Sequence, residues 1–195
     1  MKKGTIILLS IAGVIIIAFF SYKGMYNKVV QLEESVSKQW SNVESVYQRR
    51  LDLIPNLVNT VKGYADFEKS TLTQVIEARA KATSVNIDAS KLDQQSFQQF
   101  QQAQGSLSSA LSRLMVVVER YPDLKANQNF LELQAQLEGT ENRIAVERMR
   151  YNNIVASYNA YIKSFFVHML FSKEKKPYFK AEEAAAQAPK VDFSK

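Results

Sequence analysis

Apolar residues recur every three or four positions along most of the chain, and this spacing predicts amphipathic helices. The first stripe consists of Met25, Val29, Leu32, Val36, Trp40, Val43 and Tyr47. Further stripes follow in residues 57–83, 94–121 and 127–165, whereas residues 84–93 lack the period and are predicted to form a loop. Asn127 is a suitable amino-terminal cap for the last helix. The pattern therefore predicts an all-α protein, an antiparallel four-helix bundle.

Pro55 falls between the first two stripes, within QRRLDLIPNLVNTVKGYA. Inside a helix, a proline costs about 3 kcal/mol unless neighbouring groups compensate. A rod ending near Gly63 would place helices of about 60 Å and 30 Å side by side, whereas a turn at residues 51–55 gives two of about 40 Å. Asp52 would then cap the second helix, with Pro55 in its first turn. We predict the turn, and one kinked rod is the alternative.

A turn at this position brings two charged connections together at the end of the bundle farthest from the amino terminus. The residues gathered there form a candidate interaction tip: Arg49, Arg50, Asp52, Pro55, Asn56, Glu119, Asp123 and Lys125. The same topology returns the fourth helix to the opposite end.

The fourth helix ends in YIKSFFVHMLFSKEKK, an apolar run followed by lysines. Such a segment can lie at a bilayer surface, with aromatic rings at headgroup depth and lysines on anionic lipid. The candidate membrane contact comprises Phe165, Phe166, Met169, Leu170, Phe171, Lys173, Lys175 and Lys176. An equally supported alternative is that these residues complete the bundle core beside the loop at 84–93.

The amino-terminal segment, residues 5–20, carries no charge. As a helix, residues 4–22 span about 28 Å, close to the roughly 30 Å hydrocarbon core of a bilayer. A cleaved signal peptide is the alternative, but the run ends in Phe19, Phe20 and Ser21, a poor cleavage site. We expect an uncleaved anchor in the lipid bilayer. Lysines flank both ends almost equally and lean only weakly toward an internal amino terminus.

These segments divide the chain into an anchor at residues 1–23, a helical bundle at 24–171 and a flexible tail at 172–195. The tail contains too few apolar residues to fold independently. A solvated tail is the simpler expectation, with four candidate docking residues as the alternative: Tyr178, Phe179, Val191 and Phe193.

Composition argues against most chemistry. The net charge is +6, but Lys2, Lys3 and Lys23 account for half of it, and no clustered basic face indicates nucleic acid. The chain has no cysteine, a single histidine at position 168 and no glycine-rich phosphate loop. We therefore predict a protein that is not an enzyme and has no catalytic, metal or cofactor site and no small-molecule substrate. Glu138, Glu141 and Arg148 are spaced to form a structural polar seam with Arg50.

Several long blocks, in order, resemble the LemA family: QWSNVESVYQRRLDLIPNLVNTVKGYADFEKSTL, ARAKA, ERYPDLKANQNFLELQAQLEGTENRI, RMRYNNIVASYN and KPYFKAEEAAAQAPKVDF. The resemblance implies a bacterial, membrane-anchored four-helix bundle whose molecular function is not established. It also implies an external amino terminus, which would place the bundle in the cytoplasm. Phe67 stands where the family frequently has histidine. Ser164-Phe165-Phe166 lacks a proline frequent in the family, which predicts a fourth helix running unbroken toward Phe171.

Together these features predict a single-pass protein of the bacterial inner membrane that acts as an interaction or scaffold module, with a protein partner or further copies of itself. The alternative is a lipid-surface organising protein whose second membrane contact is the end of helix four. A membrane hydrolase is a third, weaker hypothesis, because no reactive group is assembled in the sequence.

Overall fold

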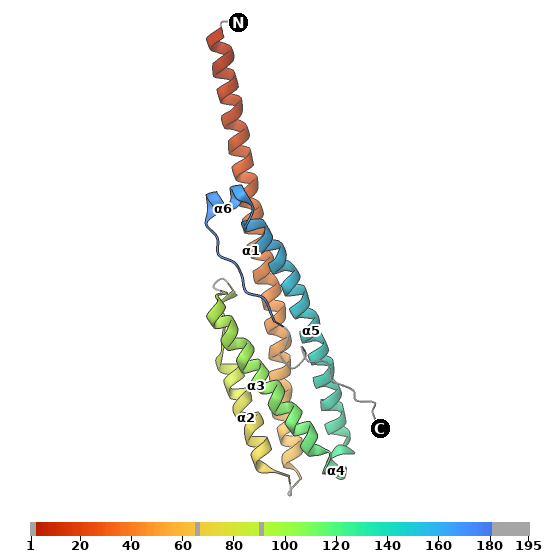
Figure 1. The fold of residues 1–195 in the computed structure, drawn as a ribbon. Coiled ribbons are helices and arrows are strands. Elements are labelled where there is room, and N and C mark those ends of the chain that lie inside the picture. Colours follow the sequence, from red (N-terminus) through yellow and green to blue (C-terminus); the bar gives the residue numbers. More distant parts are fainter. Residues whose placement is uncertain (1–2, 65–66, 90–91, 181–195) are drawn as a thin grey trace, which may run out of the picture.

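A computed structural model describes residues 3–64, 67–89 and 92–180 (Figure 1). Within these ranges the chain is all-α and forms six helices: α1 Lys3–Lys62, α2 Lys69–Ser84, α3 Gln94–Val118, α4 Pro122–Lys125, α5 Gln128–Ile162 and α6 Phe165–Phe171. The main packing contacts join α1 to α5 and α2 to α3. The result is an elongated helical bundle from which the start of α1 projects alone.

The projecting part of α1 keeps its apolar side chains exposed, and it is long and apolar enough to cross a membrane. From Val29 onward the helix turns one apolar face into the bundle, where Val36, Trp40 and Val43 are buried. We call the end of the bundle beside the projecting part the proximal end, and the end where α1 stops at Lys62 the distal end.

The predicted turn at residues 51–55 is wrong, because α1 continues through Pro55 to Lys62. Pro55 has no N–H to donate to the carbonyl of Leu51, four residues earlier. Arg79 of α2 supplies the missing donor, since its Nε lies 3.0 Å from that carbonyl oxygen. Asp52 does not cap a helix; its carboxylate accepts a hydrogen bond from Gln48 at 2.7 Å. The chain instead turns after Lys62, at Gly63.

Moving the turn does not change the direction of the later helices. The chain runs distally in α1, back in α2, distally in α3 and back in α5 (Figure 1). The lengths are unequal, because α2 has 16 residues and α5 has 35. The predicted loop after α2 covers part of the remaining length, and its Ile87 and Leu92 are buried in the core.

The core consists of two clusters, one above the other along the bundle axis. The distal cluster is built on Ile54, Leu57, Leu107, Leu114 and Phe130. The proximal cluster is mainly aromatic and is built on Trp40, Phe97, Phe100, Tyr151 and Tyr158. The predicted apolar stripes therefore face inward along most of the bundle, whereas Ile76 and Phe165, which the same stripes include, are exposed.

The ends of the last long helix give one confirmed prediction and one correction. Asn127 caps α5, and its side chain accepts a hydrogen bond from the backbone N–H of Phe130 at 3.1 Å. The predicted unbroken run to Phe171 is wrong, because α5 ends at Ile162 and α6 begins at Phe165. Ser164 adopts extended backbone, and its hydroxyl donates to the carbonyl of Tyr161 at 2.8 Å, which satisfies an acceptor at the helix end.

Candidate interaction sites

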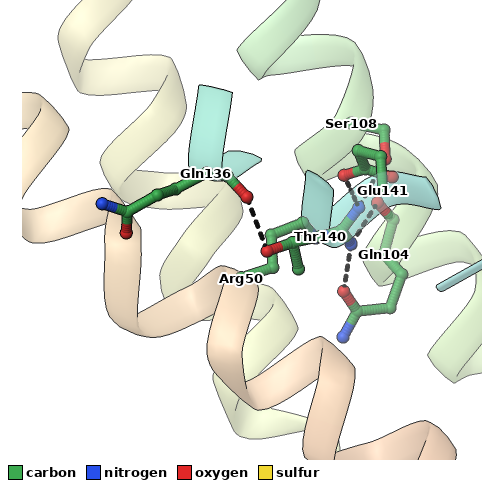
Figure 2. A network of polar contacts seen from close by, with 6 residues as sticks. All are labelled: Arg50, Gln104, Ser108, Gln136, Thr140 and Glu141. Carbon is green, nitrogen blue, oxygen red and sulfur yellow. Dashed lines mark hydrogen bonds and ion pairs between the residues drawn. The ribbon is translucent and has the colours of Figure 1, made fainter. Parts of the chain in front are cut away.

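Arg50 lies at the boundary between the two core clusters, and its guanidinium is 1% exposed. One terminal nitrogen donates to Glu141 of α5 at 2.7 Å and to Ser108 of α3 at 2.9 Å. The other donates to the side chain of Gln104, also on α3. The ring of Tyr47 packs 5.1 Å from the guanidinium carbon. Figure 2 shows these groups converging from three helices, which we call the polar layer (Arg50, Gln104, Ser108 and Glu141).

The predicted seam forms only in part. Glu141 pairs with Arg50, whereas Glu138 accepts a hydrogen bond from Gln134 on its own helix. Arg148 donates to the backbone carbonyl of Lys180 at 2.7 Å and contacts the ring of Phe179. An ion pair whose guanidinium is buried and hydrogen-bonded on several sides is suited to fixing how helices align.

The predicted interaction tip does not assemble as one cluster. Arg49, Arg50, Asp52, Pro55 and Asn56 lie inside α1, and Arg50 is about 18 Å from the end of that helix at Lys62. Of the predicted residues, only Glu119, Asp123 and Lys125 lie at the distal end.

Other residues join the two distal turns. Arg120 pairs with Glu68 at 3.0 Å, across the gap between the turn that follows α1 and the turn that follows α3. The Tyr64 hydroxyl donates to the carbonyl of Asp123 at 3.4 Å and accepts from Asn127 at 3.1 Å. The turns that follow α1 and α3 therefore meet at one end, but the first of them lies after Lys62 and is not the turn predicted at residues 51–55.

The proximal end carries an exposed apolar patch on α6. Its members are Phe165, Phe166, Met169 and Leu170, with Phe165 75% exposed. On the other face of α6, Val167 is buried. Phe171 packs against Tyr22 and Tyr26 of α1, with ring centroids 5.3 and 6.1 Å apart. These four patch residues therefore do not complete the bundle core, which was one of the two sequence-based alternatives.

Residues 173–180 run extended along the bundle, and we call them the docked segment (Figure 1). Two asparagines of α5 bind its backbone. Asn152 accepts from the N–H of Phe179 and donates to the carbonyl of the same residue, both at 2.9 Å. Asn159 makes the same pair of 2.9 Å bonds with Lys176. A free tail therefore does not describe this part of the chain, while Val191 and Phe193 lie outside the described residues.

Phe179 inserts into an aromatic pocket and is 5% exposed. Its ring lies 4.7 Å from Phe97, 5.3 Å from Tyr151 and 6.1 Å from Trp40, centroid to centroid. The pocket thus takes one wall from each of α1, α3 and α5. The sequence pattern indicates Phe179 as a docking candidate, but it does not indicate the pocket that binds the ring. The signal that could have found the site is the seven-residue spacing of Asn152 and Asn159 on one helix face.

Two buried tyrosines in this region have raised pKa values. Burial raises the pKa of the Tyr151 hydroxyl, and burial with the nearby Glu33 carboxylate raises the pKa of Tyr158. Glu33 also pairs with Lys173 of the docked segment at 3.0 Å. Within the described ranges, no three histidine, aspartate or glutamate side chains are grouped so as to hold a metal ion.

The fold defines a structural class: all-α bundles that extend from a long apolar amino-terminal helix. The chain belongs to the LemA family, whose sequence pattern matches residues 39–193. The resemblance drawn from the sequence blocks is therefore confirmed.

Individual relatives agree with this assignment. Protein LemA of Metamycoplasma hominis is 25% identical over 80% of this chain and 68% of its own length. Magnetosome protein MamQ of Magnetospirillum gryphiswaldense is 26% identical over 97% of this chain and 77% of its own length. Magnetosome protein MamQ 2 of Paramagnetospirillum magneticum is 29% identical over 69% of this chain and 56% of its own length.

Proposed function

We propose that the protein is a non-enzymatic interaction or scaffold module of the bacterial inner membrane. In this proposal an antiparallel four-helix bundle is carried by a single transmembrane helix, and α6 makes a second contact with lipid. The observation that supports it most directly is the exposed apolar patch of α6, beside the place where the apolar part of α1 ends.

The position of α6 agrees with headgroup depth. If residues 4–22 cross the hydrocarbon core, Tyr22 and Tyr26 emerge at its surface, where tyrosine is favoured. Phe171 contacts both rings, so α6 lies at the same depth. Its exposed phenylalanines and its buried Val167 face opposite ways, as in helices that lie in a bilayer surface. Lys175, in the segment that follows, is exposed and available to anionic lipid.

Two contacts with the membrane would fix the tilt of the bundle as well as its location. From Tyr26 to Lys62, α1 extends about 54 Å, so the distal end would stand at a set height above the bilayer. The helical faces between these ends would then be presented in one orientation to a protein partner or to other copies of the chain.

The absence of cysteine makes a direct test simple, because a single introduced cysteine is the only labelling site. Phe166→Cys and Val116→Cys are each labelled with the environment-sensitive fluorophore NBD, in full-length protein reconstituted into phosphatidylcholine and phosphatidylglycerol liposomes. Val116 is the matched control, since it is 71% exposed on the distal half of α3. We expect blue-shifted, brighter emission at position 166 and water-like emission at position 116.

Water-like emission at both positions would contradict the second lipid contact. The apolar patch of α6 would then be exposed to water even when only lipid is present. That result would indicate that the patch binds a protein surface instead. Blue-shifted emission at both positions would contradict the proposed orientation of the bundle.

A further inference from the structure

The docked segment is bound as a peptide ligand is bound. Asn152 and Asn159 are seven residues apart on α5, which corresponds to about 10.5 Å along a helix. Their backbone partners, Phe179 and Lys176, are three residues apart in an extended chain, which corresponds to about 10 Å. Each asparagine therefore meets one backbone unit and satisfies both its N–H and its carbonyl.

The groove thus binds the backbone of the segment at two residues, Lys176 and Phe179, and the side chain of one, Phe179. The asparagine bonds depend on extended geometry rather than on side-chain identity, as in other modes that bind peptides through their main chain. The aromatic pocket selects Phe179, and the Arg148 guanidinium lies 5.0 Å from the same ring. Arg148 also binds the carbonyl of Lys180, which orients the segment.

The junction with α6 is suited to opening. Ser172 connects α6 to the docked segment with a φ of 39°, the one positive φ at a non-glycine residue in the part of the chain that the structure describes. Serine adopts this conformation at a cost, so release of the segment would relieve it. Apart from its peptide bonds to the rest of the chain, the docked segment is held against the bundle by non-covalent contacts.

We propose that the groove formed by α1, α3 and α5 is a peptide-binding site, and that it exchanges its occupant between copies, so that residues 173–180 of one chain bind the groove of a neighbour. Every copy of the chain carries the same residues 173–180, so the segment of a second copy fits the groove. Exchange of an identical element between copies is a low-cost route to association. If the chains are anchored in one bilayer, as the proposed function states, they also meet at a high effective concentration. This inference does not depend on the lipid contact of α6.

The first test asks whether the groove binds the segment as a separate molecule. The probe is a fluorescein-labelled peptide, SKEKKPYFK, residues 172–180. Full-length wild-type protein in detergent is compared with Phe179→Ala, which weakens the internal occupant. We expect at least about tenfold tighter binding by Phe179→Ala, because in the wild type the internal segment competes at a millimolar effective concentration. A peptide with alanine in place of Phe179 is the matched control and should not bind.

The groove itself is tested by adding two isosteric substitutions, Asn152→Asp and Asn159→Asp. Each replaces an amide donor with a carboxylate that faces a backbone carbonyl. Peptide binding to the triple variant should disappear while helicity is retained. Equal binding to both Phe179→Ala proteins, or no binding to either, would overturn the proposal. Phe179→Leu serves as the weakened occupant if the alanine variant loses helicity.

The second test asks whether copies exchange the segment. Phe179→Ala has an intact groove and a defective segment, whereas Asn152→Asp/Asn159→Asp has the reverse. The two proteins, labelled through Val116→Cys with donor and acceptor dyes, are mixed in liposomes. We expect energy transfer for this complementary pair and background transfer when both partners carry all three substitutions. Background transfer from the complementary pair would overturn exchange between copies, whatever the peptide result.

Discussion

At the scale of single residues, the polar layer makes an exposed side chain more important than its exposure suggests. Glu141 is 46% exposed, yet it neutralises a guanidinium that is 1% exposed. Removing one partner of such a pair leaves a buried charge uncompensated, which is strongly destabilising. Gln104 and Ser108 would remain as hydrogen-bond partners and reduce the loss.

We predict that Glu141→Ala lowers the free energy of unfolding by roughly 2–3 kcal/mol, measured by urea denaturation followed by circular dichroism. Glu138→Ala is the matched control, because Glu138 is also exposed on α5 and bonds only within its helix. Its effect should stay within about 0.5 kcal/mol. Equal midpoints for the two variants would show that Arg50 does not need its counter-ion.

At the scale of helices, the continuity of α1 depends on a contact from another helix. Pro55 leaves the Leu51 carbonyl without its helical donor, and Arg79 of α2 provides one at 3.0 Å. The same bond ties α2 to α1, whose mutual packing is less extensive than that of α2 with α3. A compensating donor of this kind explains why the proline is tolerated in the interior of a 60-residue helix.

We predict an energetic coupling between these two positions. Arg79→Met should destabilise the wild type by about 1–2 kcal/mol, because the Leu51 carbonyl loses its partner. In a Pro55→Ala background the backbone N–H of the introduced alanine restores the helical bond, so the same substitution should cost about 1 kcal/mol less. A double-mutant cycle of urea denaturation measures the difference. Additive effects would show that Arg79 contributes through packing alone.

The same helices show what the sequence can and cannot predict. The apolar stripes predicted which faces are buried, and Asn127 marked a correct helix start. The turn assigned to residues 51–55 was wrong because the donor that rescues Pro55 comes from Arg79, far along the chain, which leaves no local signal. The argument from equal helix lengths also failed, since a loop with buried Ile87 replaces part of α2. The hydrogen bonds between Asn152 and the backbone of Phe179 involve polar groups only, so the hydrophobic pattern of the sequence gives no sign of them.

At the scale of the whole molecule, the polar layer separates two hydrophobic clusters. Leu51, Leu107 and Leu137 belong to the distal cluster, while Tyr47, Phe100 and Ile144 belong to the proximal one. Arg50, Gln104 and Glu141 fall between these residues on α1, α3 and α5. Sliding any one helix by a turn would move an apolar residue into the layer and leave the guanidinium without its partners. We therefore expect the layer to fix the relative height of the three helices.

If the layer fixes the alignment, replacing it should affect the free energy of unfolding and the alignment of the helices in different ways. Replacing the layer with Arg50→Met, Gln104→Leu and Glu141→Gln removes the desolvation penalty of the charge, so stability should be unchanged or higher by about 1–4 kcal/mol. The helices should nevertheless adopt more than one alignment. Spin labels are attached at Asn59→Cys on α1 and Glu132→Cys on α5, both exposed distal positions. Double electron–electron resonance then measures the distance between the two labels, which reports the alignment of the helices. We predict one narrow distance distribution in the parent protein and a broad or bimodal one in the apolar variant. A variant that is more stable and equally narrow would show that apolar packing alone determines the alignment and that the buried arginine has another role.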